Sequence, residues 1–202
     1  MSLFLEFSMS ISKICFNLTA IAALLLTGCA FSPQKANIAP TVSVMSSSEG
    51  NGIGVAVHVT DERPSKSLGR RGTAYGAAAE ITAAQDIAMI AQSEIIAGLK
   101  KKGFAATESE SGARAKLMVE VRLLEYSTSQ GFWTGGVHIK GALKAAASKD
   151  GKSYEKMYRS EKEERVAVVP TAEKNEKWIN DALSDVLTQL LDDKGLIMFL
   201  SQ

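Results

Sequence analysis

The chain has 202 residues, of which 46% are hydrophobic, 22% charged and 6% aromatic, a composition typical of a globular protein. Its 23 lysines and arginines against 22 aspartates and glutamates leave a net charge of +1. The basic excess of a nucleic-acid-binding protein is missing, so we expect no DNA or RNA partner. Two cysteines are too few for an all-thiolate zinc site, and the sequence predicts neither a metal site nor a cofactor.

Residues 1–28 have the pattern of a signal peptide. An apolar stretch from Ile14 to Leu26 follows Lys13. It is too short for a membrane-spanning helix, which takes about 20 residues, but it fits the hydrophobic region of a secretory signal. Glu6 is unusual in the first region of a signal, so Met9 is an alternative start of translation.

The apolar stretch ends in a sequence that resembles a bacterial lipobox, Leu26-Thr27-Gly28-Cys29. This resemblance implies cleavage before Cys29 and attachment of three acyl chains to that residue. Three chains hold a protein on a membrane far more firmly than one. The next residue is Ala30 rather than Asp, which favours the outer membrane, with the protein facing the periplasm. Cys15 leaves with the signal, so no disulfide is expected.

Residues 29–40 are interpreted as the lipidated N-terminus and a tether, and residues 41–202 as one periplasmic domain. The tether contains two prolines and no apolar period. A weak strand is predicted over residues 41–45. The alternating apolar residues between Ile53 and Val59 then predict a half-buried strand, which ends in Asp61-Glu62-Arg63-Pro64.

Residues 65–76 contain three glycines and no apolar period, which predicts a loop. Thr82 and Gln85 have the spacing of a capping box and predict a helix from Ala83 to Lys102. Its predicted buried stripe consists of Ile87, Ile90, Ala91, Ile95 and Leu99.

Apolar alternation predicts two further strands, over residues 117–123 and 137–145. A tight turn at Asp150-Gly151 then predicts another strand over residues 152–168, with a charged middle, which Pro170 stops. The charged run from Glu161 to Arg165 is typical of an exposed sheet edge. A last helix over residues 172–192 is predicted to bury Trp178 and to be broken by Gly195, before an apolar tail at residues 196–200.

These elements predict an α+β fold. We expect a two-layer sandwich with a mainly antiparallel sheet of about four strands and two helices packed on one face.

With these features in place, the chain resembles the YajG-type family of small Gram-negative lipoproteins over most of residues 20–200. Besides the lipobox, the resemblance depends on residues 57–63, 86–104, 156–159 and 178–187. The family has no established activity. The resemblance therefore implies an envelope address and an architecture, and no catalytic residues.

His58 and His138 are the two histidines, each on the strand face opposite the branched apolar residues. Either, with Asp61, would have to carry the alternative function that we considered, a periplasmic hydrolase acting on peptidoglycan or lipid. We expect polar sheet-face histidines instead. For Asp61 and Glu62 we expect a salt bridge with Arg63, or helix capping, rather than a catalytic carboxylate pair, because neighbouring strand residues point to opposite faces.

Two connections combine groups that favour binding: Arg70, Arg71 and Tyr75 in one, Phe132 and Trp133 in the other. Arginine and large aromatic side chains dominate binding hot spots. The sequence therefore predicts a non-enzymatic, outer-membrane-anchored lipoprotein. We expect it to bind an envelope protein or glycan in an accessory or structural role, with these five residues as candidate contacts.

Overall fold

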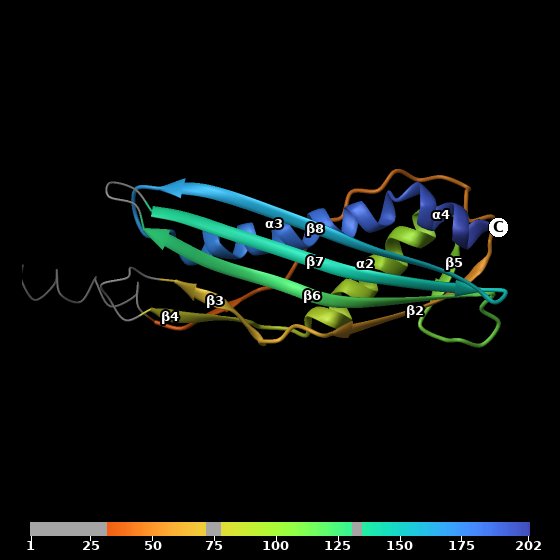
Figure 1. The fold of residues 1–202 in the computed structure, drawn as a ribbon, viewed down its shortest axis with the longest axis horizontal. Coiled ribbons are helices and arrows are strands. Elements are labelled where there is room, and N and C mark those ends of the chain that lie inside the picture. The colour runs from red at the N-terminus through yellow and green to blue at the C-terminus, as the bar shows by residue number, and fades with distance from the viewer. Residues whose placement is uncertain (1–31, 72–77, 131–134) are drawn as a thin grey trace, which may run out of the picture.

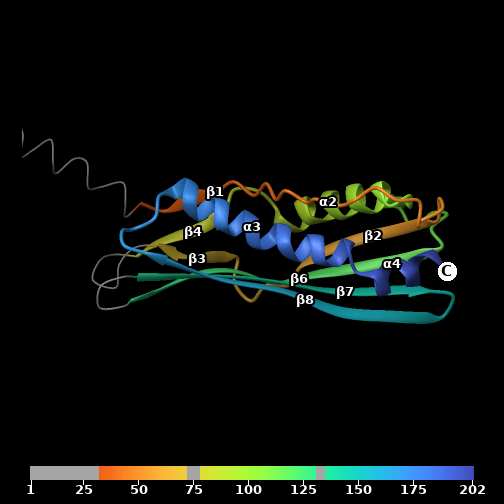
Figure 2. The ribbon, with the colours of Figure 1, turned by 90° about the horizontal axis from the view of Figure 1, so that it is seen from above.

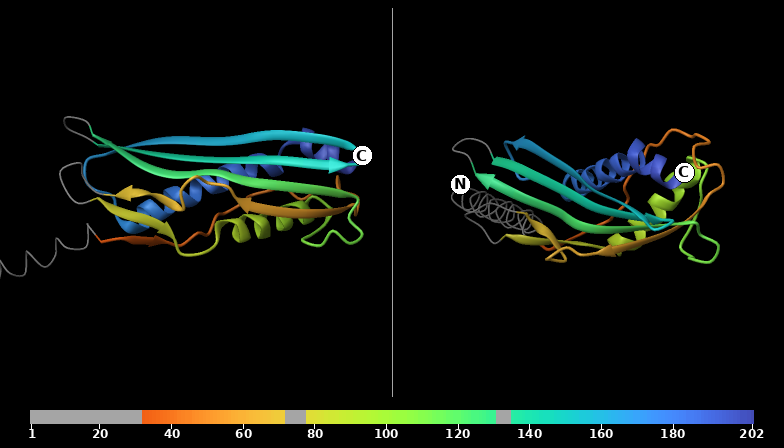
Figure 3. Two further views of the ribbon diagram at one scale, coloured as in Figure 1. Left: turned by 60° about the horizontal axis from the view of Figure 1, so that its bottom comes forward. Right: turned by 45° about the vertical axis from the view of Figure 1, so that its right-hand side comes forward.

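A computed structural model of the chain describes residues 32–71, 78–130 and 135–202. These residues form an elongated molecule in two layers, with a long twisted sheet and helices that lie on one of its faces (Figures 1 and 2). The opposite face of the sheet carries no helix of the described chain (Figure 3).

Three long antiparallel strands form the central part of the sheet: β6 (Ala115–Gln130), β7 (Gly135–Lys149) and β8 (Lys152–Val166). The turn predicted between the last two is confirmed, with Asp150 and Gly151 both at positive φ, as a two-residue hairpin turn requires. Among the strands that the structure describes, β8 pairs only with β7, so the charged run from Glu161 to Arg165 lies on an edge strand, as predicted.

The other edge of β6 carries two shorter strands in succession, β2 (Gly54–Asp61) and β3 (Ser67–Arg71), both parallel to it. Three more strands extend the sheet from them: β5 (Ala105–Thr107) on β2, β4 (Ala79–Ala83) on β3, and β1 (Gln34–Ala36) on β4. Gly69 is required where β3 meets β6, because a Cβ there would fall 1.7 Å from the carbonyl oxygen of Tyr126.

The prediction of about four mainly antiparallel strands is therefore wrong. The fold is α+β, but the described residues build an eight-stranded mixed sheet. β1 and β5 have three residues each, and β3 has five, two of them arginine. Such segments are too short for apolar periodicity to reveal, and β3 lies within the region predicted as a loop.

Three helices are described: α2 (Ile87–Lys101), α3 (Ala172–Leu191) and α4 (Lys194–Ser201). The predicted start of the first helix is wrong, because Thr82 and Ala83 belong to β4 and the Asp86 side chain caps α2. α3 agrees with its prediction to within one residue. Gly195 is not what ends α3, because that helix already ends before Asp193. The Asp193 side chain caps α4, and the predicted apolar tail is therefore helical.

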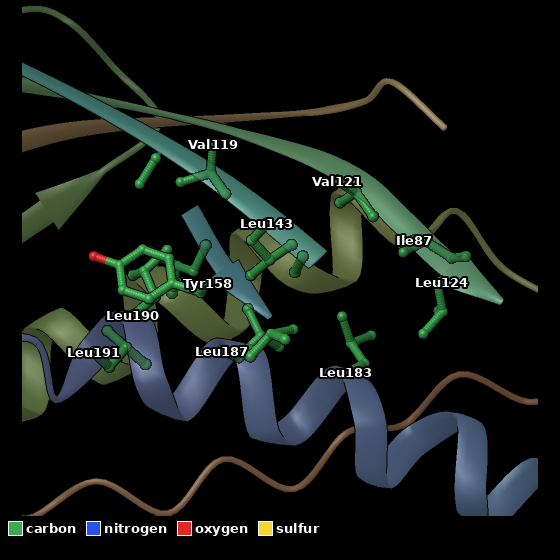
Figure 4. Packing of buried hydrophobic residues seen from close by; sticks show 14 of the residues in the cluster. Ile87, Val119, Val121, Leu124, Leu143, Tyr158, Leu183, Leu187, Leu190 and Leu191 are labelled. Atoms are coloured by element: carbon green, nitrogen blue, oxygen red, sulfur yellow. The ribbon is translucent and has the colours of Figure 1, made fainter. Parts of the chain in front are cut away.

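The core lies between the helices and the covered face of the sheet. Figure 4 shows Leu183, Leu187 and Leu190 of α3 directed towards β6, β7 and β8, where Val119 and Leu143 meet them. Trp178 is buried, as predicted. The stripe predicted for the first helix is buried at four positions, while Ile90 is half-buried.

The segment interpreted as a tether is instead largely part of the fold. Residues 34–44, which we call the strap, run over the helices from β1 towards the opposite end of the molecule (Figure 2). Gln34, Ala36, Ile38 and Pro40 are buried, and the residues between them are exposed. No strand forms over the predicted range 41–45.

Polar side chains of α3 hold the strap through its backbone. Three alternate strap amides donate to three α3 side chains spaced four residues apart: Asn37 to Glu176 (2.7 Å), Ala39 to Asn180 (2.9 Å) and Thr41 to Ser184 (2.8 Å). Two strand residues advance about 6.6 Å and four helical residues about 6 Å, so the two periods nearly match.

A buried aspartate joins α4 to the edge of the sheet. Asp193 Oδ2 accepts hydrogen bonds from the hydroxyls of Tyr154 and Tyr158, each at 2.6 Å, and lies 3.1 Å from Lys156 Nζ. Burial by itself raises the pKa of Asp193, but these donors outweigh it and hold the pKa at about 2. Burial and the adjacent carboxylate raise the pKa of Tyr158. We call these four residues the Asp193 cluster.

Candidate binding groove

An open groove of about 590 Å³ lies where β2 ends beneath the start of α2. β5 pairs only with Gly54–Ala56, so no strand of the described chain lies on the outer edge of the second half of β2. We call this space the β2–α2 groove. It is lined by residues from β2 and its continuation, the end of β4 and the start of α2: Val59, Thr60, Asp61, Glu62, Arg63, Lys66, Thr82, Ala83, Gln85, Asp86, Ile87 and Ala88.

A fixed cluster of charges, Asp61, Arg63 and Lys66, forms one wall of the groove. Arg63 donates to both oxygens of Asp61, from Nε at 2.8 Å and Nη2 at 2.9 Å, which confirms the predicted salt bridge. Lys66 Nζ lies 2.9 Å from Asp61 Oδ2 and donates to the Asp61 carbonyl oxygen at 2.9 Å. Paired hydrogen bonds between a guanidinium and a carboxylate fix both groups in orientation.

Accessibility separates these charges. The Arg63 side chain is only 4% exposed, and its Nη1 has no hydrogen-bond partner among the described residues, whereas the Lys66 side chain is 70% exposed. Partial burial raises the pKa of Asp61, but the hydrogen bonds from Arg63 and Lys66 outweigh this effect and set the pKa at about 2. Asp61 is therefore ionised at neutral pH and holds no proton to donate as a general acid.

Side chains near the start of α2 fix the opposite wall. Asp86 accepts hydrogen bonds from the amides of Ala88 and Met89 and so begins the helix. Gln85 accepts from the strap amide of Ile38 at 2.9 Å, and Gln92 accepts from the Val59 amide of β2 at 2.9 Å. Gln92 thus occupies a donor on the outer edge of β2, and that edge is closed to strand addition at this point.

The groove offers a mixed surface to a ligand. Val59, Ala83 and Ala88 contribute apolar contact area, and Thr60 and Thr82 contribute hydroxyls. The exposed Glu62 and Lys66 bring one charge of each sign. A few placed polar groups on a partly apolar surface are typical of a binding site.

The hydrolase arrangement that we considered is not brought together. His58 and Asp61 lie three positions apart on β2 and so face opposite sides of the sheet. His58 Nε2 lies 3.7 Å from Glu110 instead. His138 Nε2 lies 3.1 Å from Ser129 Oγ, and among the described residues no carboxylate oxygen lies within ion-pair distance of the His138 ring.

The predicted binding residues are only partly described. Arg70 is exposed on β3, where it donates to the Ala78 carbonyl oxygen at 3.1 Å. Arg71 is buried and donates to the Ser32 carbonyl oxygen at 3.1 Å. The other predicted site residues lie outside the described residues: Tyr75, Phe132, Trp133, Cys29 and the lipobox residues Leu26, Thr27 and Gly28.

Three residues that shape the groove were not predicted as site residues: Lys66, Gln85 and Asp86. The sequence signal for the site was the charged end of β2, Asp61-Glu62-Arg63. Gln85 carried a misleading signal, because its spacing from Thr82 fits a capping box, although its side chain bonds the strap.

Within the described residues, no helix combines the length and the apolar character needed to cross a membrane. Over the same ranges, His, Cys, Asp and Glu side chains do not gather in threes in a way that could hold a metal ion.

Residues 40–201 match the model of a protein family described as an uncharacterised lipoprotein. This range covers most of the chain and includes every element of the structure from β2 to α4. Comparison with curated proteins gives no match.

Solved structures resemble the fold. One is a Xanthomonas campestris protein of the DUF330 family, with a TM-score of 0.56 and 17% identity, covering 81% of this chain and 95% of that one. Another is described as a homologue of a neuraminyllactose-binding hemagglutinin from Helicobacter pylori, with a TM-score of 0.45 and 11% identity, over 81% of this chain and 96% of that one. At such identities, the first likeness supports the fold alone.

Proposed function

The chain belongs to this family of uncharacterised lipoproteins, and from that premise we propose that it is anchored in the outer membrane by lipid on Cys29. We propose further that it binds another envelope component through the β2–α2 groove, in a non-enzymatic, accessory role. The lipobox and Ala30 support the anchor and its address. The observation that carries the binding role is an open groove whose charges are fixed by Arg63 and Asp61.

The anchor is tested with the full-length chain and its Cys29→Ala variant. We expect the natural chain to incorporate a fatty-acid analogue and to fractionate with the outer membrane. The variant should carry no label and should be either uncleaved or released into the periplasm. Unchanged mass and membrane fractionation of the variant would contradict lipidation at Cys29.

The binding role is tested by photo-crosslinking in intact cells. A photoreactive residue in place of Glu62, exposed at the groove, is expected to capture a discrete envelope partner. The same residue in place of Glu155, exposed on β8, serves as the matched control and should not capture it. Ala88→Trp narrows the groove without changing its charge and should abolish the product from position 62. Equal capture from both positions would contradict a role for the groove.

The predicted loop residues form a second proposed contact surface. Replacing Phe132 and Trp133 together by alanine should weaken partner capture by about 2 kcal/mol or more, within the range of binding hot spots. Thermal stability should change little. Loss of folding in that double variant, with no effect on capture when Arg70 and Arg71 are replaced, would make these residues structural. The partner surface would then lie elsewhere, in the groove or on the sheet face that carries His138, Lys140 and Lys144.

The rival function is a hydrolase, and the contact between Ser129 and His138 is the observation that bears on it. A hydroxyl beside an imidazole is one part of a nucleophile and base pair. Incubation of the purified protein with sacculi and with phospholipids discriminates between the two functions. Product formation that is lost in His138→Ala or His58→Ala would replace the binding role with catalysis.

A further inference from the structure

The described chain begins at one end of the elongated molecule, and several segments meet there (Figure 2). Arg71, the last residue of β3, donates to the carbonyl oxygen of Ser32. Gln34 Nε2 donates to the carbonyl oxygen of Ala172, in the first turn of α3, at 2.7 Å. The connection between β8 and α3, residues 167–171, therefore lies beside the first described residues. We call this part of the molecule, formed by Ser32–Gln34, Arg71 and residues 167–171, the valine end, after Val168 and Val169 in the connection.

Two consecutive valines are exposed on that connection. Val168 is 79% exposed and Val169 is 37% exposed, between the last residue of β8 and the residue that caps α3. The other exposed large apolar side chains among the described residues are single methionines: Met45, Met89, Met118 and Met198. A pair of adjacent exposed valines is unfavourable in water, which makes this connection the natural candidate for a contact with an apolar phase.

The position of this end relative to the anchor is limited by chain length. Whatever the arrangement of residues 29–31, the step from Cys29 to Ser32 spans at most about 10 Å. If Cys29 carries acyl chains, as proposed above, Ser32 lies within about 10 Å of the bilayer's polar surface. The valine end is then close to the membrane, whereas the turn between β7 and β8 lies at the opposite end of the molecule (Figure 1).

We propose that the valine end is a membrane-docking surface, in which Val168 and Val169 enter the interfacial region of the bilayer that holds the acyl chains of Cys29. This inference rests on the proposed lipidation. Charges at this end are balanced, because four exposed basic residues (Lys35, Arg70, Arg165 and Lys174) lie there together with four exposed acidic residues (Glu80, Glu163, Glu164 and Glu173). Docking therefore depends on apolar contact rather than on anionic lipid, and salt does not weaken it.

The test uses the lipidated protein in vesicles of phosphatidylethanolamine and phosphatidylglycerol. With Cys15 removed in the signal and Cys29 alkylated, as proposed, a single introduced cysteine is the only free thiol, because the sequence has two cysteines. An environment-sensitive fluorophore is attached at Val168→Cys or, as control, at Met45→Cys. Met45 is 85% exposed and lies near the opposite end of the strap.

Lipids that carry a nitroxide near the headgroup should quench at least half of the emission from position 168 and little from position 45. The quenching should persist in 0.5 M sodium chloride. At this concentration the Debye length is only about 4 Å, so electrostatic attraction to the membrane is screened. A Val169→Asp change should reduce the quenching at position 168. Circular dichroism of each labelled variant checks that the fold is retained.

Two failures are distinguishable. Protein that does not float with the vesicles contradicts the proposed anchor itself. Protein that floats with the vesicles, but whose label at position 168 is quenched no more than the label at position 45, overturns the docking surface and leaves the anchor intact. Quenching at position 168 that disappears in high salt also overturns the proposal, because it would show an electrostatic contact.

Discussion

Two aspartates, Asp61 and Asp193, have equally lowered pKa values but lie in different surroundings. Both are held at a pKa of about 2 by donors that outweigh the effect of burial. The oxygens of Asp193 are engaged by two tyrosine hydroxyls, a lysine and the amide of Gly195, and its side chain is 8% exposed. Asp61 borders an open groove of about 590 Å³.

The difference teaches that a lowered pKa does not by itself identify a functional site. Asp193 lies between the sheet edge and α4, and its donors come from β8 and from α4 itself. Asp61 receives its donors from residues two and five positions along the chain, and a water-accessible space adjoins it. We therefore assign Asp193 to the stability of the fold and Asp61 to the shape of the groove.

The largest expected effect is on stability at Asp193. Asp193→Ala removes the acceptor of the buried Tyr158 hydroxyl and the cap of α4, so we expect a loss of about 4 kcal/mol in the free energy of unfolding. Urea titration followed by circular dichroism measures it. Tyr154→Phe removes one hydrogen bond and should cost about 1 kcal/mol. Equal losses in the two variants would contradict the role of Asp193 as the shared acceptor on which the cluster depends.

Asp61→Ala should cost less, about 2 kcal/mol. It leaves the buried Arg63 without its carboxylate, but water in the adjoining groove can hydrate part of the guanidinium. The same titration measures the loss, and crosslinking from position 62 should fall as well. A loss of stability that equals that of Asp193→Ala would remove the contrast between the two clusters.

Acid should weaken both clusters. Since the folded pKa values of about 2 lie below the ordinary value of 3.8, the unfolded chain binds protons first as the pH falls, and stability decreases. Between pH 6 and pH 3 each carboxylate should contribute a loss of about 1 kcal/mol. The decrease should be smaller by about that amount in Asp61→Asn and in Asp193→Asn, as measured by urea titration at both pH values. Unchanged pH dependence in either variant would contradict the pKa assigned to that residue.

The smallest effect on stability is expected at Lys66, whose side chain is largely exposed. Lys66→Met should change the free energy of unfolding by less than about 1 kcal/mol, because exposed ion pairs contribute little. It removes a charge from the groove, so partner crosslinking from position 62 should decrease while the melting temperature stays nearly constant. A large drop in melting temperature without loss of crosslinking would assign Lys66 to the fold instead.

The extent to which the sequence predicts this fold depends on the length of each element. α3 and β2 follow apolar periodicity over many residues and were predicted close to their observed bounds. The largely charged β8 was predicted instead from the tight turn before it and the proline after it. The strap also alternates between buried and exposed residues, but its buried positions are Gln34, Ala36, Ile38 and Pro40. Only one of these is typical of a strand, so hydrophobicity does not reveal the alternation.

The candidate site was predictable only where its residues are neighbours in sequence. Asp61 and Arg63 lie two positions apart, and a salt bridge with Arg63 was among the uses predicted for the carboxylates of Asp61 and Glu62. The roles of Gln85 and Gln92 depend on backbone amides 47 and 33 residues away. The sequence does not indicate which distant backbone amide a glutamine side chain will bind. The groove wall that Gln85 and Gln92 fix could therefore not be predicted without the fold.

The hydrogen bonds along the strap also have a mechanical consequence. The strap leaves Ser32 at one end of the molecule and runs along its long axis, with Asn37, Ala39 and Thr41 each bonded sideways to α3. A pull on Ser32 along that axis loads these three bonds, and the pairing of β1 with β4, in shear and at the same time. Bonds sheared together resist more force than bonds opened one after another. The first segment of the domain is thus attached in the geometry that best withstands tension from its N-terminal side.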